Sequence, residues 1–261
     1  MKKIFLILIF LFSSNIHAQH FGNANRYDVT IKKIQVCETA VISSETSFTT
    51  SNCVTLGNSD LTVDIASTSV GSTLGKYADT TAMIQGRTYR YFVPTLSRSF
   101  TIKGSVDFTK ASDSSAGKCN TDEDASIASN ARHVTLSAGK VGGIATPMIG
   151  YVPSATSSAV ICRNQDCSDF TGSQTISHDL PNATSLYGNA ISVPTDSTGT
   201  FEMIYQLSSP YTVGETVPVI TMLFGTNNAL EVFAQRDDEG NDTCRINSYF
   251  PKFTVSVSTP D

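Results

Sequence analysis

The chain has 261 residues, of which 40% are hydrophobic and 16% are charged, and its formal net charge is −5. The hydrophobic fraction is large enough for a folded core, whereas the charged fraction is well below the usual value of roughly one quarter. The acidic balance and the lack of a basic patch argue against nucleic acids and anionic membranes as partners.

The first residues, 1–18, have the pattern of a secretory signal peptide. Two lysines precede an apolar run, Ile4–Phe12, and the small residue Ala18 stands at the expected cleavage position. The apolar run is too short to serve as a permanent membrane span. We therefore expect a secreted mature chain that begins near Gln19 and resides in the periplasm, at the cell surface or outside the cell.

Six cysteines, an even number, indicate disulfides in an exported protein. Proximity along the chain predicts three pairs: Cys37–Cys53, Cys162–Cys167 and Cys119–Cys244. Zinc binding is the alternative, but the sequence contains no C-x-x-C pair and only three histidines beyond the signal peptide.

The mature chain opens with a polar segment, Gln19–Arg26, for which we expect a flexible arm. Tyr27, Val29 and Ile31 then alternate with polar residues and predict the first strand. The alternation slips at Lys32–Lys33, which predicts a β-bulge. An arm followed by a strand suggests self-assembly, because such a segment can add to the sheet edge of a neighbouring molecule.

The stretch Thr88–Val106 is the longest alternating ribbon, and we expect it to be central to the core. Pro94 lies inside it and cannot donate to a ladder, so it should break the run, bend it or mark a sheet edge. Tyr89 and Tyr91 share one face of this ribbon. We interpret them as core residues, and a sugar-stacking or protein-binding platform is the alternative.

Three strand sequences, Tyr27–Val36, Val63–Ala66 and Gly86–Tyr91, follow one another in an order that resembles uncharacterised secreted β-sandwich domains of bacterial surface proteins. The resemblance covers roughly the first third of the chain. It implies a fold and no particular activity.

Short strands and frequent turn signals predict an all-β chain, an antiparallel β-sandwich with disulfides. Val217–Phe224 is nearly all apolar and predicts a strand buried on both faces. Thr121–Ala131 is the one helix candidate, with Thr121 as its cap. The Gly-rich stretch Ser137–Thr146 is the best boundary if there are two sandwich portions. These would be 19–136 and 137–261, and the alternative is one continuous domain over 27–258.

An acidic loop is the sharpest candidate for a binding site. Carboxylate and amide oxygens around a glycine are ligands that Ca²⁺ accepts, although the spacing is not that of an EF-hand. The alternative is a solvated hairpin tip, and we expect no other cofactor. The candidate calcium ligands are Asp237, Asp238, Glu239, Asn241 and Asp242.

The sequence contains no G-x-S-x-G nucleophile elbow and no Gly-rich phosphate loop, so we expect no enzyme and name no catalytic residue. We expect an exported structural or adhesive protein that associates with itself or with a surface partner, for example as a filament subunit. The second hypothesis is a secreted ligand-binding module, calcium-assisted or carbohydrate-binding. The third is a hydrolase with dispersed residues that joins His133 or His178 to a carboxylate.

Overall fold

A computed structural model of the chain describes residues 19–44, 47–67, 77–125, 137–151, 160–162, 170–175, 190–192, 199–248 and 252–259. The predicted signal peptide, His133 and His178 lie outside these residues.

The described residues form antiparallel strands and two short 3-10 helices. The strands are β1 (Gln19–Gly22), β2 (Ala24–Ser44), β3 (Ser47–Gly57), β4 (Leu61–Asp64), β5 (Thr88–Thr109), β6 (Ala116–Asn120), β7 (Ser137–Val141), β8 (Met148–Tyr151), β9 (Val160–Cys162), β10 (Phe170–Thr175), β11 (Ala190–Ser192), β12 (Thr200–Thr212), β13 (Val219–Gly225), β14 (Leu230–Arg236), β15 (Asp242–Ser248) and β16 (Lys252–Ser258). The 3-10 helices are η2 (Thr80–Ala82) and η3 (Glu123–Ala125).

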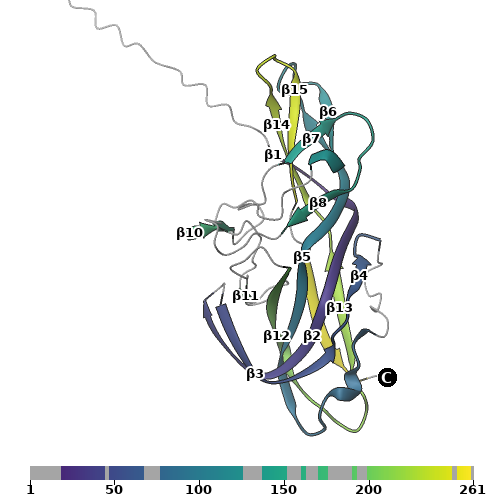
Figure 1. The fold of residues 1–261 in the computed structure, drawn as a ribbon, viewed down its shortest axis with the longest axis vertical. Coiled ribbons are helices and arrows are strands. Elements are labelled where there is room, and N and C mark those ends of the chain that lie inside the picture. The colour runs from purple at the N-terminus through teal and green to yellow at the C-terminus, as the bar shows by residue number, and fades with distance from the viewer. Residues whose placement is uncertain are drawn as a thin grey trace, which may run out of the picture.

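Two very long strands, β2 and β5, run side by side through the molecule and give it an elongated shape (Figure 1). Their antiparallel ladder extends from Ala24, opposite Gly104, to Cys37, opposite Tyr91. A strand rises about 3.3 Å per residue, so a strand of this length spans most of a small domain. The ribbon expected to be central is therefore central.

The ladder between β2 and β5 contains the predicted bulge. Its register shifts between Ile31 and Lys33, where the sequence alternation slips. Pro94, by contrast, neither breaks β5 nor marks an edge. It is buried opposite Ile34, with β12 on the other side of β5. The fixed φ of proline is compatible with a strand, so the strand loses only one N–H donor.

At one end of the molecule the large sheet curls back on itself (Figure 1). Its strands follow the order β1-β14-β15-β7-β6-β5, and β5 then pairs with β2, which follows β1 after a single residue, Asn23. Long antiparallel strands twist and coil, and this favours curling. The antiparallel all-β class is confirmed, but the large sheet is a half-barrel, so the two-layered sandwich is not confirmed.

Away from the half-barrel, further strands flank β2 and β5. β4 and β3 pair with the outer edge of β2, whereas β12 and then β11 extend the sheet beyond β5. A separate two-stranded sheet of β13 and β16 places Met222 in the core and packs Ile220, Val255 and Val257 against it. The core therefore lies between the long strands and this two-stranded sheet.

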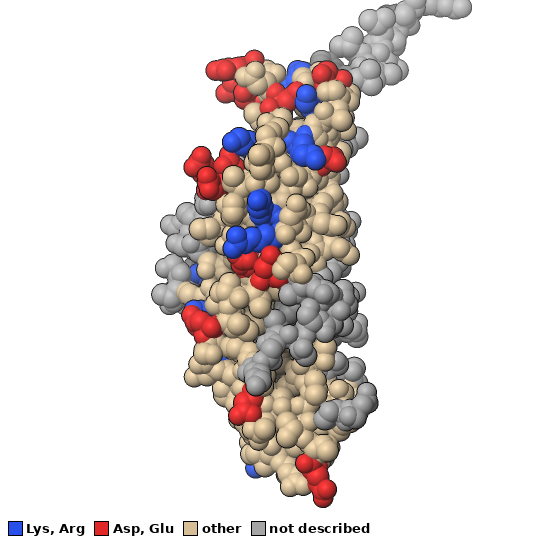
Figure 2. Space-filling model, turned by 90° about the vertical axis from the view of Figure 1, so that its right-hand side faces the viewer, with Lys and Arg blue, Asp and Glu red and all other residues tan. Residues whose placement is uncertain are grey.

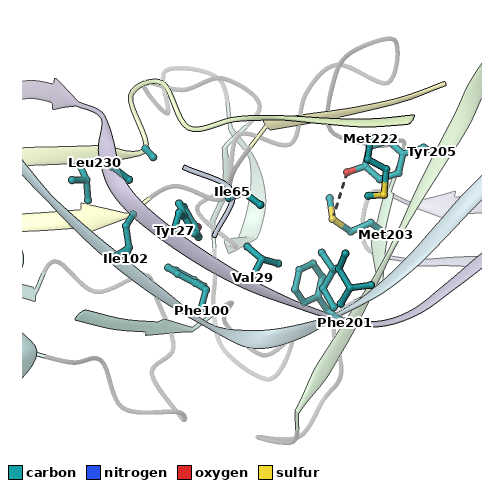
Figure 3. Close-up of a cluster of buried hydrophobic side chains, with 14 of the residues drawn as sticks. Tyr27, Val29, Ile65, Phe100, Ile102, Phe201, Met203, Tyr205, Met222 and Leu230 are labelled. Carbon is teal, nitrogen blue, oxygen red and sulfur yellow. Dashed lines mark hydrogen bonds between the residues drawn. The ribbon is translucent and has the colours of Figure 1, made fainter. Parts of the chain in front are cut away.

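Aromatic and aliphatic side chains from β2, β5 and β12 meet in one cluster (Figure 3). The ring centroids of Tyr27 and Phe100 lie 5.2 Å apart. The hydroxyl of Tyr205 donates a hydrogen bond to the sulfur of Met203 at 3.5 Å, and burial raises the pKa of both Tyr27 and Tyr205. Tyr89 is fully buried, which confirms its interpretation as a core residue.

Two local expectations are wrong. Val217 precedes β13 and is 48% exposed, and Val219 at the start of β13 is 37% exposed, because β13 belongs to a two-stranded sheet that has the core on one side only. Thr121 does not cap a helix. Its buried hydroxyl accepts a hydrogen bond from the N–H of Gly104 and donates one to the carbonyl of Thr146. In the described part of this stretch, the only helical turn is η3.

Two of the three predicted disulfides are confirmed. Cys37 and Cys53 face each other across β2 and β3, and Cys119 on β6 is bonded to Cys244 on β15. The predicted pair Cys162–Cys167 lies outside the described side chains. The Cys119–Cys244 bond joins residues 125 positions apart and ties the half-barrel together.

Removal of the Cys119–Cys244 bond should destabilise the fold more than removal of Cys37–Cys53. The two bonds span 125 and 16 residues, and the chain-entropy model assigns them about 5 and about 3 kcal/mol. We expect C119A/C244A to lower the free energy of unfolding by the larger amount in urea titrations. An equal loss in C37A/C53A would contradict this account of the two bonds.

Gly139 on β7 should tolerate no side chain while the Cys119–Cys244 bond is present. A Cβ atom there would clash with the Sγ atoms of both cysteines. Overpacking of this kind costs about 1–3 kcal/mol, so G139A should be less stable by that amount. In the C119A/C244A background the cost should fall, because both sulfur atoms are gone. A double-mutant cycle that shows no coupling would refute the clash.

Candidate functional site

The turn that joins β14 to β15, residues 236–242, contains the predicted calcium ligands, and we call it the acidic turn. Asp237 closes this turn on itself. Its Oδ1 accepts hydrogen bonds from the backbone N–H of Asn241 at 2.7 Å and of Glu239 at 3.1 Å. Its Oδ2 accepts another from the side-chain amide of Asn241 at 3.0 Å. These bonds lower the pKa of Asp237, with the side-chain amide of Asn241 as the largest cause.

The other predicted ligands point in different directions. Asp242 accepts hydrogen bonds from the backbone N–H and the hydroxyl of Ser112, and so holds the loop between β5 and β6. Glu239 accepts a long bond of 3.4 Å from Asn241. Among the described residues, Asp238 has no hydrogen-bond or ion-pair partner.

The described residues hold no group of three or more His, Cys, Asp or Glu side chains arranged for a metal ion. The acidic turn has the form of a solvated hairpin tip, and calcium binding by it stays a prediction. Figure 2 shows acidic side chains gathered at the end of the molecule where β14 and β15 meet.

The predicted assembly arm is folded into its own chain. Residues 19–22 form β1, which pairs with β14. Tyr27, Val29 and Ile31 are at most 2% exposed, and their strand is paired with β4 on one edge and with β5 on the other. For a neighbour to take up these residues, the core of the chain would have to open.

Several strands have one edge without a partner strand in the described part of the chain. β3 and β4 pair only with β2, β8 pairs only with β5, and β11 pairs only with β12. The longest of these edges belongs to β3, which forms a two-stranded ribbon with the second half of β2. Val41 on this ribbon is 68% exposed. Exposed strand edges are templates for pairing with other chains.

At the base of the ribbon, β2 and β5 separate. The last pair of their ladder is Cys37 with Tyr91, after which β2 stays with β3 while the start of β5 stays with β12. We call this place the fork. The fork holds an open pocket of about 420 Å³, lined by Glu38, Thr39, Gly86, Arg87, Thr88 and Arg90.

The pocket in the fork carries more positive than negative charge. Arg87 Nη1 donates to Glu38 Oε1 at 2.7 Å, and this partner raises the pKa of the guanidinium. Arg90 is exposed and has no ion-pair or hydrogen-bond partner among the described residues. Two guanidinium groups therefore share the pocket with one carboxylate.

Sequence reasoning missed this pocket. Glu38 and Arg90 are far apart in the chain, and the pairing of β2 with β5 alone brings them together. The only local signal is the position of Glu38 beside Cys37, whose disulfide marks the base of the ribbon.

Comparisons with protein-family models, with curated proteins and with solved structures find no match for this chain. In the part of the chain that the structure describes, no helix has the length and apolar character needed to cross a membrane.

The hydrogen bonds of Asp237 give a prediction for the acidic turn. Since its pKa is lowered in the folded state, the stability that this carboxylate contributes is present at neutral pH and is lost as the pH falls through the folded pKa. N241A removes the largest cause and should move the pKa of Asp237 up toward its ordinary value. NMR titration of the carboxylates checks this, with D238N as a control that should leave the pKa of Asp237 nearly unchanged.

Proposed function

We propose that the mature chain is an exported structural protein of the cell exterior, a subunit that associates with copies of itself or with other surface proteins. The observation that carries the proposal is the ladder of β2 and β5, which extends from Ala24, opposite Gly104, to Cys37, opposite Tyr91, and so covers most of both strands. A long ladder makes an elongated body, with one large hydrophobic cluster and a small second one around Cys37.

The two disulfides support the same function. One closes the base of the β2–β3 ribbon and the other closes the half-barrel, so covalent bonds hold both regions. Disulfides persist in oxidising compartments outside the cytosol. They suit a protein that must keep its shape outside the cell, which is also what the predicted signal peptide implies.

The ribbon of β2 and β3 offers a surface for association. Beyond Cys37 and Cys53, β2 is no longer paired with β5, and β3 has no second partner strand within the described residues. Val41 places an exposed apolar side chain on this ribbon. Backbone pairing at such an edge gives affinity, and side-chain contacts add specificity.

Negative-stain electron microscopy and light scattering of the purified mature chain, residues 19–261, test the proposal. We expect regular assemblies built from elongated subunits, in amounts that rise with protein concentration. Charged residues block pairing at strand edges, so V41K should reduce assembly. The matched control is I144K, which makes the same kind of change at an 80% exposed residue outside the strands.

A monomer that stays monodisperse at high concentration and binds no surface protein would overturn the structural proposal. Equal effects of V41K and I144K would show that the ribbon is not the contact, even if assemblies form.

The second candidate function is a secreted ligand-binding module. The open pocket in the fork favours it, since it joins charged and hydroxyl groups on one surface. In the calcium-assisted form of this hypothesis, Ca²⁺ raises the melting temperature, because a ligand that binds only the folded state stabilises it. Melting curves with calcium and with a chelator separate this form from the structural proposal.

A further inference from the structure

We propose that the fork receives the acidic turn of a second copy of this chain, so that subunits associate head to tail. The inference rests on the proposed structural function and adds an end-to-end contact between subunits, separate from the edge of the β2–β3 ribbon.

The fork and the acidic turn lie at opposite ends of the molecule. β5 joins the two regions: its first residues pair with β12 beside the fork, and its last residues pair with β6 in the half-barrel that carries β14 and β15. Figure 1 shows β14 and β15 at one end of the long axis, whereas the start of β5, which pairs with the end of β12, lies toward the other. A contact between different surfaces at opposite ends repeats indefinitely and makes an open filament.

Charge favours this pairing. The acidic turn carries the carboxylates of Asp237, Asp238 and Glu239 in succession, preceded by Arg236. Asp237 is engaged in closing the turn, whereas Asp238 is exposed and has no partner within the described residues. Arg90 is the matching cation in the fork, since Arg87 already has Glu38. A guanidinium and a carboxylate form a strong, directional pair.

Shape favours it as well. The acidic turn is a tight hairpin end, with Gly240 at φ 84° and a hydrogen bond from the N–H of Gly240 to the carbonyl of Asp237. Two diverging strands bound the fork, and its pocket of about 420 Å³ has room for the side chains of such a turn. Beyond the Cys37–Tyr91 pair, the facing edges of β2 and β5 no longer pair with each other, so their backbone groups can bond to an inserted hairpin.

Charge reversal tests the contact. R90E and D238R should each raise the concentration needed for half-maximal assembly by about tenfold, because like charges then meet. An equimolar mixture of the two variants should assemble again, since each turn then meets an opposite charge in the fork of the other variant. The double variant R90E/D238R should also assemble alone. Sedimentation velocity and electron microscopy give the readouts.

Matched controls carry the same reversals elsewhere. K103E lies on the same strand as Arg90 but away from the fork, and D124R lies in η3, outside the acidic turn. Both should assemble like the wild type. Near-UV circular dichroism checks that every variant is folded. As a second measurement, carbodiimide treatment of assembled R90K should join position 90 of one chain to Asp238 or Glu239 of another, as identified by mass spectrometry.

The outcomes separate the contact from the proposed function. Wild-type assemblies that persist in folded R90E and D238R, or a mixture that stays dissociated, would overturn the contact while the structural function stands. A wild-type chain that never associates would overturn both. Loss of binding to an acidic saccharide in R90E, with assembly unchanged, would assign the fork to a ligand instead.

Discussion

The ladder between β2 and β5 is the interaction on which the rest of the structure depends. It supplies the long axis, and the other strands of the large sheet are attached to one of its two strands, either directly or through a neighbouring strand. β3 and β4 complete the free edge of β2, while β12, β8 and β6 follow one another along the free edge of β5. Tyr27 and Phe100 pack across this ladder and anchor the core. Because the pairing lies between residues far apart in the chain, much of the fold depends on long-range contacts, which are slower to form than local ones.

The places where this ladder ends have consequences for function. The ladder ends at Ala24, opposite Gly104, and the preceding strand β1 pairs with β14 as the sheet curls into the half-barrel. At the other end of the ladder, near Cys37, β2 and β5 diverge, and the space between them is the fork. One long pairing therefore creates both a closed end with an acidic turn and an open end with a charged pocket. An elongated subunit with two different ends is what a head-to-tail structural assembly requires.

Covalent bonds reinforce the regions where the ladder does not reach. Cys119 and Cys244 connect strands that β7 separates in the sheet order, and Gly139 leaves the space for their sulfur atoms. Cys37 and Cys53 hold the ribbon at its base, beside the pocket. The spacing of the cysteines was enough to predict both pairs. When cysteines that lie close together in the chain are paired with each other, Cys119 and Cys244 are the two that remain. The part played by Gly139 could not be predicted, since it depends on which strand passes over the bond.

Four features could be predicted from the residues alone: the antiparallel all-β class, the central ribbon, the bulge at Lys32–Lys33 and two disulfides. These follow from alternation and spacing, which are local properties of the chain. Long-range contacts are needed to explain why the sheet curls into a half-barrel, why β5 continues through Pro94, and why Tyr27, Val29 and Ile31 lie inside their own core. The same contacts bring Arg90 and Glu38 into one pocket and leave Asp238 exposed at the far end. Those outcomes depend on strand order and register, which residues distant in sequence set together, and no local pattern encodes them.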